Sequence, residues 1–152
     1  MSPIDILKTS CAEALANPAF APNQPTVGET HCNEAAMFIA QAMGCGELQG
    51  LMADQQYAKM LANVGGHWAK VTGAEASQHA IAGGLAFAAA SSGMLGETHG
   101  HICVIEPEPM RFSGSLNKLV PEVCNVGRAN ADEKESEAFP VSMGEPDYFT
   151  WG

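Results

Sequence analysis

The sequence predicts one α+β domain, in which helices in the first half pack on a small sheet formed by the second half. Three observations support this class. Apolar residues at helical spacing dominate the first 64 residues, and short apolar or alternating runs follow at 85–90 and 101–106. No internal repeat or linker divides the 152 residues, which are enough to bury one core. We therefore expect a single domain over residues 1–152.

Four helices are expected in chain order. The first shows Leu7 and Cys11 on one apolar side. The prolines of segment 17–25 cannot continue a helix, so this stretch is expected to be an ordered loop. Thr30 is a candidate N-cap for the second helix, and Gly44 ends it. The first, third and fourth helices are expected at residues 4–16, 53–64 and 74–82. The second is expected to begin at 30–32 and to end at 43.

Four strands are also expected, with loops between them. Residues 91–100 contain glycines and predict a loop, and the charged run 132–137 predicts a solvated, mobile one. The aromatic ending at Tyr148, Phe149 and Trp151 is expected to dock back on the body. The expected strands are 68–71, 85–90, 101–106 and 120–126.

Composition and charge restrict the classes of function. The apolar fraction of 46% and the charged fraction of 16% are ordinary for a globular protein. The net charge of −10 argues against nucleic acid and anionic membranes as partners. The start of the chain has no secretory signal, which predicts synthesis in the cytoplasm. The five cysteines lack the spacing of metal ligands, so we expect neither a metal nor another cofactor. Two states of the cysteines remain open: a reduced set with one functional thiol, or one or two disulfides together with a free thiol.

Cys32 is the leading candidate nucleophile. It stands where a turn gives way to an apolar helical run, in Gly-Glu-Thr-His-Cys-Asn-Glu. The positive end of a helix lowers the pKa of a thiol, and the thiolate is the reactive form. The alternative is that Cys32 is a small buried core residue.

His101 is the candidate general base. It opens an expected strand directly after Gly100, and a glycine there leaves room for the thiol or the substrate to approach. His99 lies two residues away and shares the same strand face. A metal site formed by His99 and His101 is therefore a further alternative.

A third residue is expected to orient His101, from the strand that pairs with 101–106. Asn125 is the preferred candidate, because its amide oxygen can accept a hydrogen bond from the imidazole. Glu122 is the alternative, on the opposite strand face. Asn125 could instead cap the turn before Gly127.

The remaining histidines, tryptophan and cysteines receive simpler interpretations. His31 lies next to Cys32 and is expected to touch substrate, as is His99. Trp68 belongs to the core or borders a substrate groove. The other cysteines are interpreted as packing residues: Cys11, Cys45, Cys103 and Cys124.

These segments resemble the papain-like cell-wall hydrolases of the NlpC and CHAP group, and especially the compact amidase effectors of bacterial type VI secretion and related phage lysins. They occur in the order seen in that family and span most of the chain from 28 to 127. The resemblance rests on Thr30-His-Cys-Asn-Glu with its helix, Trp68 with the helix 74–84, Gly100-His-Ile-Cys-Val-Ile, and Val123-Cys-Asn-Val-Gly.

The resemblance implies a papain-like fold with a small antiparallel sheet. It also implies hydrolysis of amide bonds in peptidoglycan stem peptides, with Cys32 as nucleophile, His101 as base and Asn125 as the third polar residue. The backbone N–H of Cys32 would contribute to the oxyanion hole. A delivered effector would act in the periplasm or outside the cell and would have a cognate immunity protein. The alternatives are a transferase or deamidase acting on protein, and a catalytically silent binding protein with the same fold.

Overall fold

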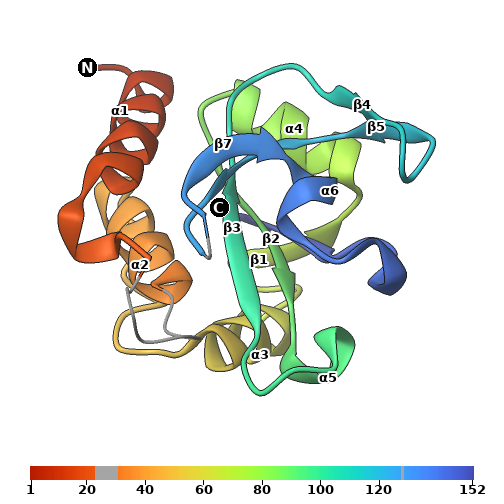
Figure 1. Ribbon diagram of the computed structural model, residues 1–152. Helices are drawn as coiled ribbons and strands as arrows, with labels where there is room; N and C mark the ends of the chain where they lie inside the picture. The colour runs from red at the N-terminus through yellow and green to blue at the C-terminus, as the bar shows by residue number, and fades with distance from the viewer. Residues whose placement is uncertain (23–30, 128) are drawn as a thin grey trace.

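A computed structural model describes residues 1–22, 31–127 and 129–152. It shows an α+β protein with helices at the N-terminal side and a six-stranded antiparallel sheet (Figure 1). The sheet order is β1-β8-β2-β3-β6-β7, and a separate hairpin pairs β4 with β5. Within the described residues, no helix combines the length and the apolar character needed to cross a membrane.

Helix α1 (Pro3–Ala16) begins with a capping box and covers one side of the sheet. The Ser2 side chain accepts a hydrogen bond from the Asp5 backbone N–H, and the Asp5 carboxylate accepts one from the Ser2 backbone N–H, which satisfies two otherwise free N–H groups. The buried residues of α1 include Leu7 and Cys11 at i and i+4. This face packs against α2 and β6, so the helix and the sheet share one core.

Three further helices surround the sheet. α2 (Cys32–Ala42) packs on α1 and β3, and α3 (Ala53–Ala62) packs on β1, β2 and β3. α4 (Gly73–Ile81) begins at a Thr72 capping box and packs on β2 and β8. These are the predicted helices, with ends that differ by at most two residues from the predicted ones. The short helix η1 (Pro18–Phe20) follows α1, within the loop predicted at 17–25. Residues 23–25 of that loop and the predicted N-cap Thr30 lie outside the described residues.

The centre of the sheet is apolar and built largely from small residues. β2 is buried along its whole length in the sequence Leu-Ala-Phe-Ala-Ala-Ala, which lets neighbouring elements approach closely. The last strand, β8, inserts between β1 and β2, so the aromatic C-terminal residues dock as predicted. The strands of this sheet are β1 (Trp68–Val71), β2 (Leu85–Ala90), β3 (His101–Ile105), β6 (Glu122–Asn125), β7 (Ala131–Lys134) and β8 (Asp147–Trp151).

The region after β3 is more regular than predicted. The expected strand 120–126 is divided at Pro121 into β5 (Lys118–Val120) and β6, and β5 pairs with β4 (Arg111–Ser113). The prediction of a loop at 132–137 is wrong: these residues form the edge strand β7 and helix α6 (Glu135–Ala138). An edge strand needs hydrogen bonds on one side only, so its charged side chains can face solvent.

Two shorter helices complete the chain. α5 (Ser92–Leu95) lies within the segment predicted as a loop at 91–100, and the Ser91 side chain caps it. Gly96 ends α5 in the left-handed conformation, with φ of 66°. Helix η2 (Val141–Met143) leads into β8.

Candidate active site

His101 and Asn125 are joined by a hydrogen bond at the centre of the candidate site. β3 and β6 pair antiparallel with Val104 opposite Cys124, which confirms that the predicted strands are neighbours. The pairing brings the start of β3 next to the end of β6. The distance between His101 Nε2 and Asn125 Oδ1 is 2.7 Å. Asn125 therefore takes the place that the sequence predicts for a residue that orients the imidazole.

Glu133 on β7 fixes the orientation of the Asn125 amide. Asn125 Nδ2 donates to Glu133 Oε1 across 2.6 Å, and an ionised carboxylate can only accept. The amide oxygen must then face His101, so His101 Nε2 is the nitrogen that donates. The lone pair of His101 is left on Nδ1. This chain of two hydrogen bonds selects one tautomer of a base.

The surroundings of His101 favour the neutral imidazole. Burial lowers the pKa of His101, although the Asn125 hydrogen bond opposes this shift. The Phe139 ring packs against the imidazole with centroids 5.1 Å apart. Gly127 closes another side: a Cβ atom there would lie 3.3 Å from His101 Cε1. Burial thus favours the uncharged imidazole, which is held by packing as well as by hydrogen bonds.

Cys103 also touches this pair, which sequence reasoning missed by interpreting it only as a packing residue. Its Sγ lies 3.3 Å from His101 Nε2 and 3.2 Å from Asn125 Oδ1. Burial raises the pKa of the Cys103 thiol well above its ordinary value, and the neighbouring Cys32 raises it further. A buried thiol that stays protonated is a poor nucleophile. Cys103 therefore acts as a second donor to Asn125.

Cys32 is the first residue of α2, at the helix start predicted for the nucleophile. Its side chain is 4% exposed, and α2 packs on β3, the strand that carries His101. Two hydrogen bonds anchor this end of α2: Asn33 Nδ2 donates to the Leu51 carbonyl across 3.3 Å, and Gln56 Nε2 donates to the Asn33 carbonyl across 3.0 Å. The fully buried Gln56 thus holds the start of α2 against α3.

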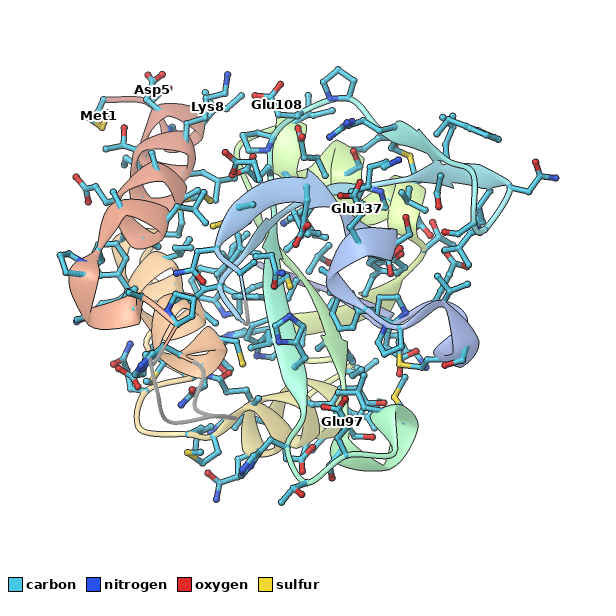
Figure 2. All side chains as sticks on the ribbon, viewed as in Figure 1. Met1, Asp5, Lys8, Glu97, Glu108 and Glu137 are labelled. Atoms are coloured by element: carbon cyan, nitrogen blue, oxygen red, sulfur yellow. The ribbon has the colours of Figure 1, made fainter. Side chains whose placement is uncertain are left out.

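A cavity of about 370 Å³ opens beside His101 and Asn125. Carboxylates from three elements line it: Glu97 after α5, Glu133 on β7 and Glu137 on α6. Figure 2 shows Glu97 beside α5 and Glu137 on α6, and both line this cavity. The negative lining favours a cationic group on whatever molecule enters.

The residues predicted to bind substrate lie in three different settings. His31 occupies the N-cap position of α2 without a side-chain capping hydrogen bond, and its Nδ1 lies 2.8 Å from Glu34 Oε1. His99 is exposed in the loop before β3. Trp68 is 1% exposed on β1, three strands from β3, so it packs in the core. Among the described residues, no third His, Cys, Asp or Glu joins His99 and His101 in a metal-binding group.

The prediction that Gly100 leaves room for the thiol or the substrate is wrong. A Cβ atom at Gly100 would lie 2.8 Å from both the Ala90 carbonyl oxygen and Asp54 Oδ1. The absent side chain makes room for the protein itself: Asp54 Oδ1 accepts a hydrogen bond from the Ser92 backbone across 2.6 Å. Gly100 therefore lets α3, α5 and the end of β2 meet, and Gly127 is the glycine beside the imidazole.

Comparison of this chain with protein-family models and with curated proteins finds no match.

Proposed function

We propose that this protein is a cysteine hydrolase with a papain-like arrangement of helix and sheet, in which Cys32 is the nucleophile and His101 the base. The observation that carries the proposal is the Glu133–Asn125–His101 hydrogen-bond chain, which leaves Nδ1 of His101 as a basic nitrogen. Cys32 supports it, because this thiol begins the helix that packs on the His101 strand. A base, its orienting residue and a thiol at a helix start are the parts that thiol catalysis needs.

The proposed reaction is acyl transfer through a thioester. His101 Nδ1 takes the proton of the Cys32 thiol as the sulfur attacks the carbonyl carbon of an amide. The imidazolium then gives this proton to the leaving amine as the carbon–nitrogen bond breaks. A water molecule, deprotonated by His101, attacks the thioester; the acid is released and the proton returns to the sulfur. Asn125 holds the ring through both steps.

We further propose that the substrate is an amide of peptidoglycan stem peptides. The resemblance of the Cys32, His101 and Asn125 segments to cell-wall hydrolases supports this class. The cavity next to His101 agrees with it, because its Glu97 and Glu137 carboxylates suit a substrate with a free amine near the scissile bond. The same machinery would serve a deamidase or transferase acting on protein, so the product has to be identified.

The test is digestion of purified peptidoglycan, followed by mass spectrometry of the released muropeptides. Cys32→Ala and His101→Ala should each lower release by at least about 10³-fold, because they remove the reacting groups. Cys45→Ala is the matched control, since Cys45 is equally buried in another part of the core. Cys103→Ala tests the thiol that contacts His101. Unchanged cleavage by Cys32→Ala, or loss confined to Cys103→Ala, would contradict the assignment.

Two further measurements separate the alternatives. In the wild-type protein, iodoacetamide near neutral pH should alkylate Cys32 faster than the other four cysteines; uniform labelling would favour a catalytically silent binding protein. Incubation with glutamine-rich model proteins should leave them unchanged. Deamidated or cross-linked protein, with intact peptidoglycan, would assign the site to the other reactions.

A further inference from the structure

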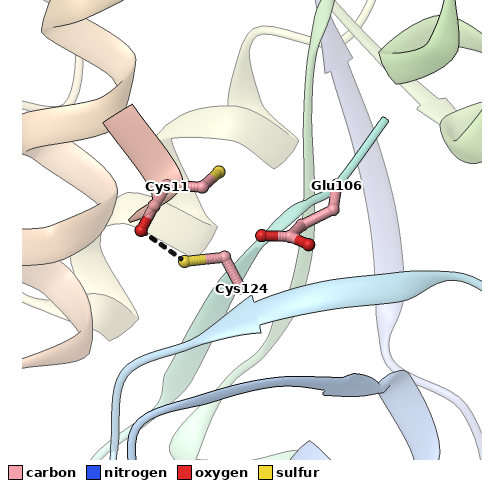
Figure 3. A group of neighbouring side chains, drawn as sticks. All are labelled: Cys11, Glu106 and Cys124. Atoms are coloured by element: carbon pink, nitrogen blue, oxygen red, sulfur yellow. Dashed lines mark hydrogen bonds between the residues drawn. The ribbon is translucent and has the colours of Figure 1, made fainter. Parts of the chain in front are cut away.

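A second group of reactive side chains lies away from His101, between α1 and the sheet. Cys11 comes from α1, Cys124 from β6, and Glu106 from the residue that follows β3. Their two sulfur atoms and one carboxylate oxygen all lie within 4.8 Å of one another. Figure 3 shows the Glu106 carboxylate extending toward the two cysteines. Residues up to 113 positions apart in the chain thus place three ligand atoms around one point.

Asp132 lies beside this group on the neighbouring strand. β7 pairs with β6 so that Asp132 stands opposite Cys124. β3 pairs with β6 so that Glu106, directly after β3, lies on the same face of the sheet as Cys124. Glu106 and Asp132 line a cavity of about 200 Å³ that gives this group a path to solvent. Lys8 lines the same cavity, and its Nζ lies 3.9 Å from Glu108 Oε1 (Figure 2). Lys8 is therefore paired with Glu108.

We propose that Cys11, Cys124, Glu106 and Asp132 form a structural Zn²⁺ site. Two sulfur and two carboxylate ligands suit zinc, which accepts both types in a four-coordinate tetrahedron. Calcium and magnesium require oxygen ligands only, so the two cysteines exclude them. Two sulfurs about 2.3 Å from a tetrahedral ion lie about 3.8 Å apart. The sulfur atoms of Cys11 and Cys124 lie within 4.8 Å of each other, close to that spacing.

The site would tie α1 to the sheet. α1 reaches the sheet mainly through β6, and Cys124 Sγ already contacts the Cys11 carbonyl oxygen at 3.6 Å. A Zn²⁺ ion between them would add bonds from the helix to β6, to the end of β3 and to β7. The bound ion would replace the protons of the two thiols, and these protons would be released to solvent.

Zinc uptake by the full-length, chelator-treated protein in a thiol-free phosphine reductant tests the proposal. The protein should take up one Zn²⁺ per chain, and its thermal midpoint should rise with zinc concentration. Co²⁺ should give the thiolate charge-transfer band and the strong visible bands of a tetrahedral site. The Co²⁺ spectrum needs no variant, so it remains informative if a substitution impairs folding.

Variants locate the ion. Cys11→Ser and Cys124→Ser should abolish stoichiometric uptake, and Glu106→Gln should weaken it at least about 10-fold. Cys45→Ser controls for loss of a buried cysteine and should bind like the wild type. The proposal is overturned if the reduced wild-type protein binds no zinc, if Co²⁺ shows no thiolate band, or if uptake survives both cysteine substitutions. A Cys11–Cys124 disulfide in a protein that binds no zinc after reduction would overturn it equally.

Discussion

Replacement of Glu135 by Gln should make the protein more stable at alkaline pH. Glu135 begins α6 and is fully buried. Neither of its carboxylate oxygens accepts a hydrogen bond within the described residues. The nearby Tyr148 hydroxyl donates instead to Glu145 across 3.4 Å. Burial raises the pKa of Glu135 from 4.5 to about 7, and the neighbouring Tyr148 hydroxyl opposes this shift only in part.

The sign of the pH dependence follows from proton linkage. Between pH 4.5 and 7 the unfolded chain ionises Glu135 while the native protein keeps it protonated. The native state therefore loses stability as pH rises through this window and stays at the lower level above it. The difference between the two pKa values corresponds to about 3 kcal/mol. The glutamine side chain of the variant carries no ionisable proton, so the variant does not undergo this loss.

Urea denaturation at pH 4, 5.5, 7 and 8 measures the effect. The free energy of unfolding of Glu135→Gln minus that of the wild type should rise by about 3 kcal/mol from the lowest to the highest pH. Glu106, whose pKa burial raises to about 9, titrates in both proteins and cancels in this difference. Glu13→Gln, at an exposed position of α1, controls for the loss of one negative charge. A difference that does not change with pH would refute the argument that Glu135 is protonated in the native state.

Two other substitutions test the geometry around the candidate site. Glu133→Gln replaces a charged acceptor of Asn125 with a neutral amide; we expect hydrolysis to fall about 10-fold and the acidic limb of its pH profile to shift, because hydrogen bonds to charged groups contribute about 1.5–3 kcal/mol. A pH profile like that of the wild type would show that Glu133 does not orient the base. Gly100→Ala places a Cβ atom against Ala90 and Asp54, so chemical denaturation should show a loss of about 1–3 kcal/mol; no loss would mean that α3 and β2 yield easily.

Local sequence patterns predicted those parts of the fold that short-range physics determines. Gly44, which follows the end of α2, and the fully apolar run of β2 mark their elements without help from the rest of the chain. β7 could not be found in this way. Its sequence, Ala-Asp-Glu-Lys, has low strand propensity, and it becomes a strand because β6 offers a row of unpaired backbone groups.

The candidate site shows the same division. The expected pairing of two strands was enough to predict that Asn125 would meet His101, and their hydrogen bond is present. Glu133 was missed because its contact with Asn125 requires β7. Trp68 and Gly100 were interpreted from motif position alone, and long-range packing decides both. The packing places Trp68 in the core and fills the space at Gly100 with Asp54.

One strand connects the candidate active site with the proposed zinc site. Cys124 and Asn125 are consecutive on β6, so their side chains project to opposite faces of the sheet. Asn125 holds His101 on one face, and Cys124 meets Cys11 on the other. The pairing of β6 with β3 sets both contacts, because His101 is the first residue of β3 and Glu106 directly follows its last residue. An ion that bridges Cys124 and Glu106 would therefore fix the strand register on which the His101–Asn125 hydrogen bond depends, without touching either residue.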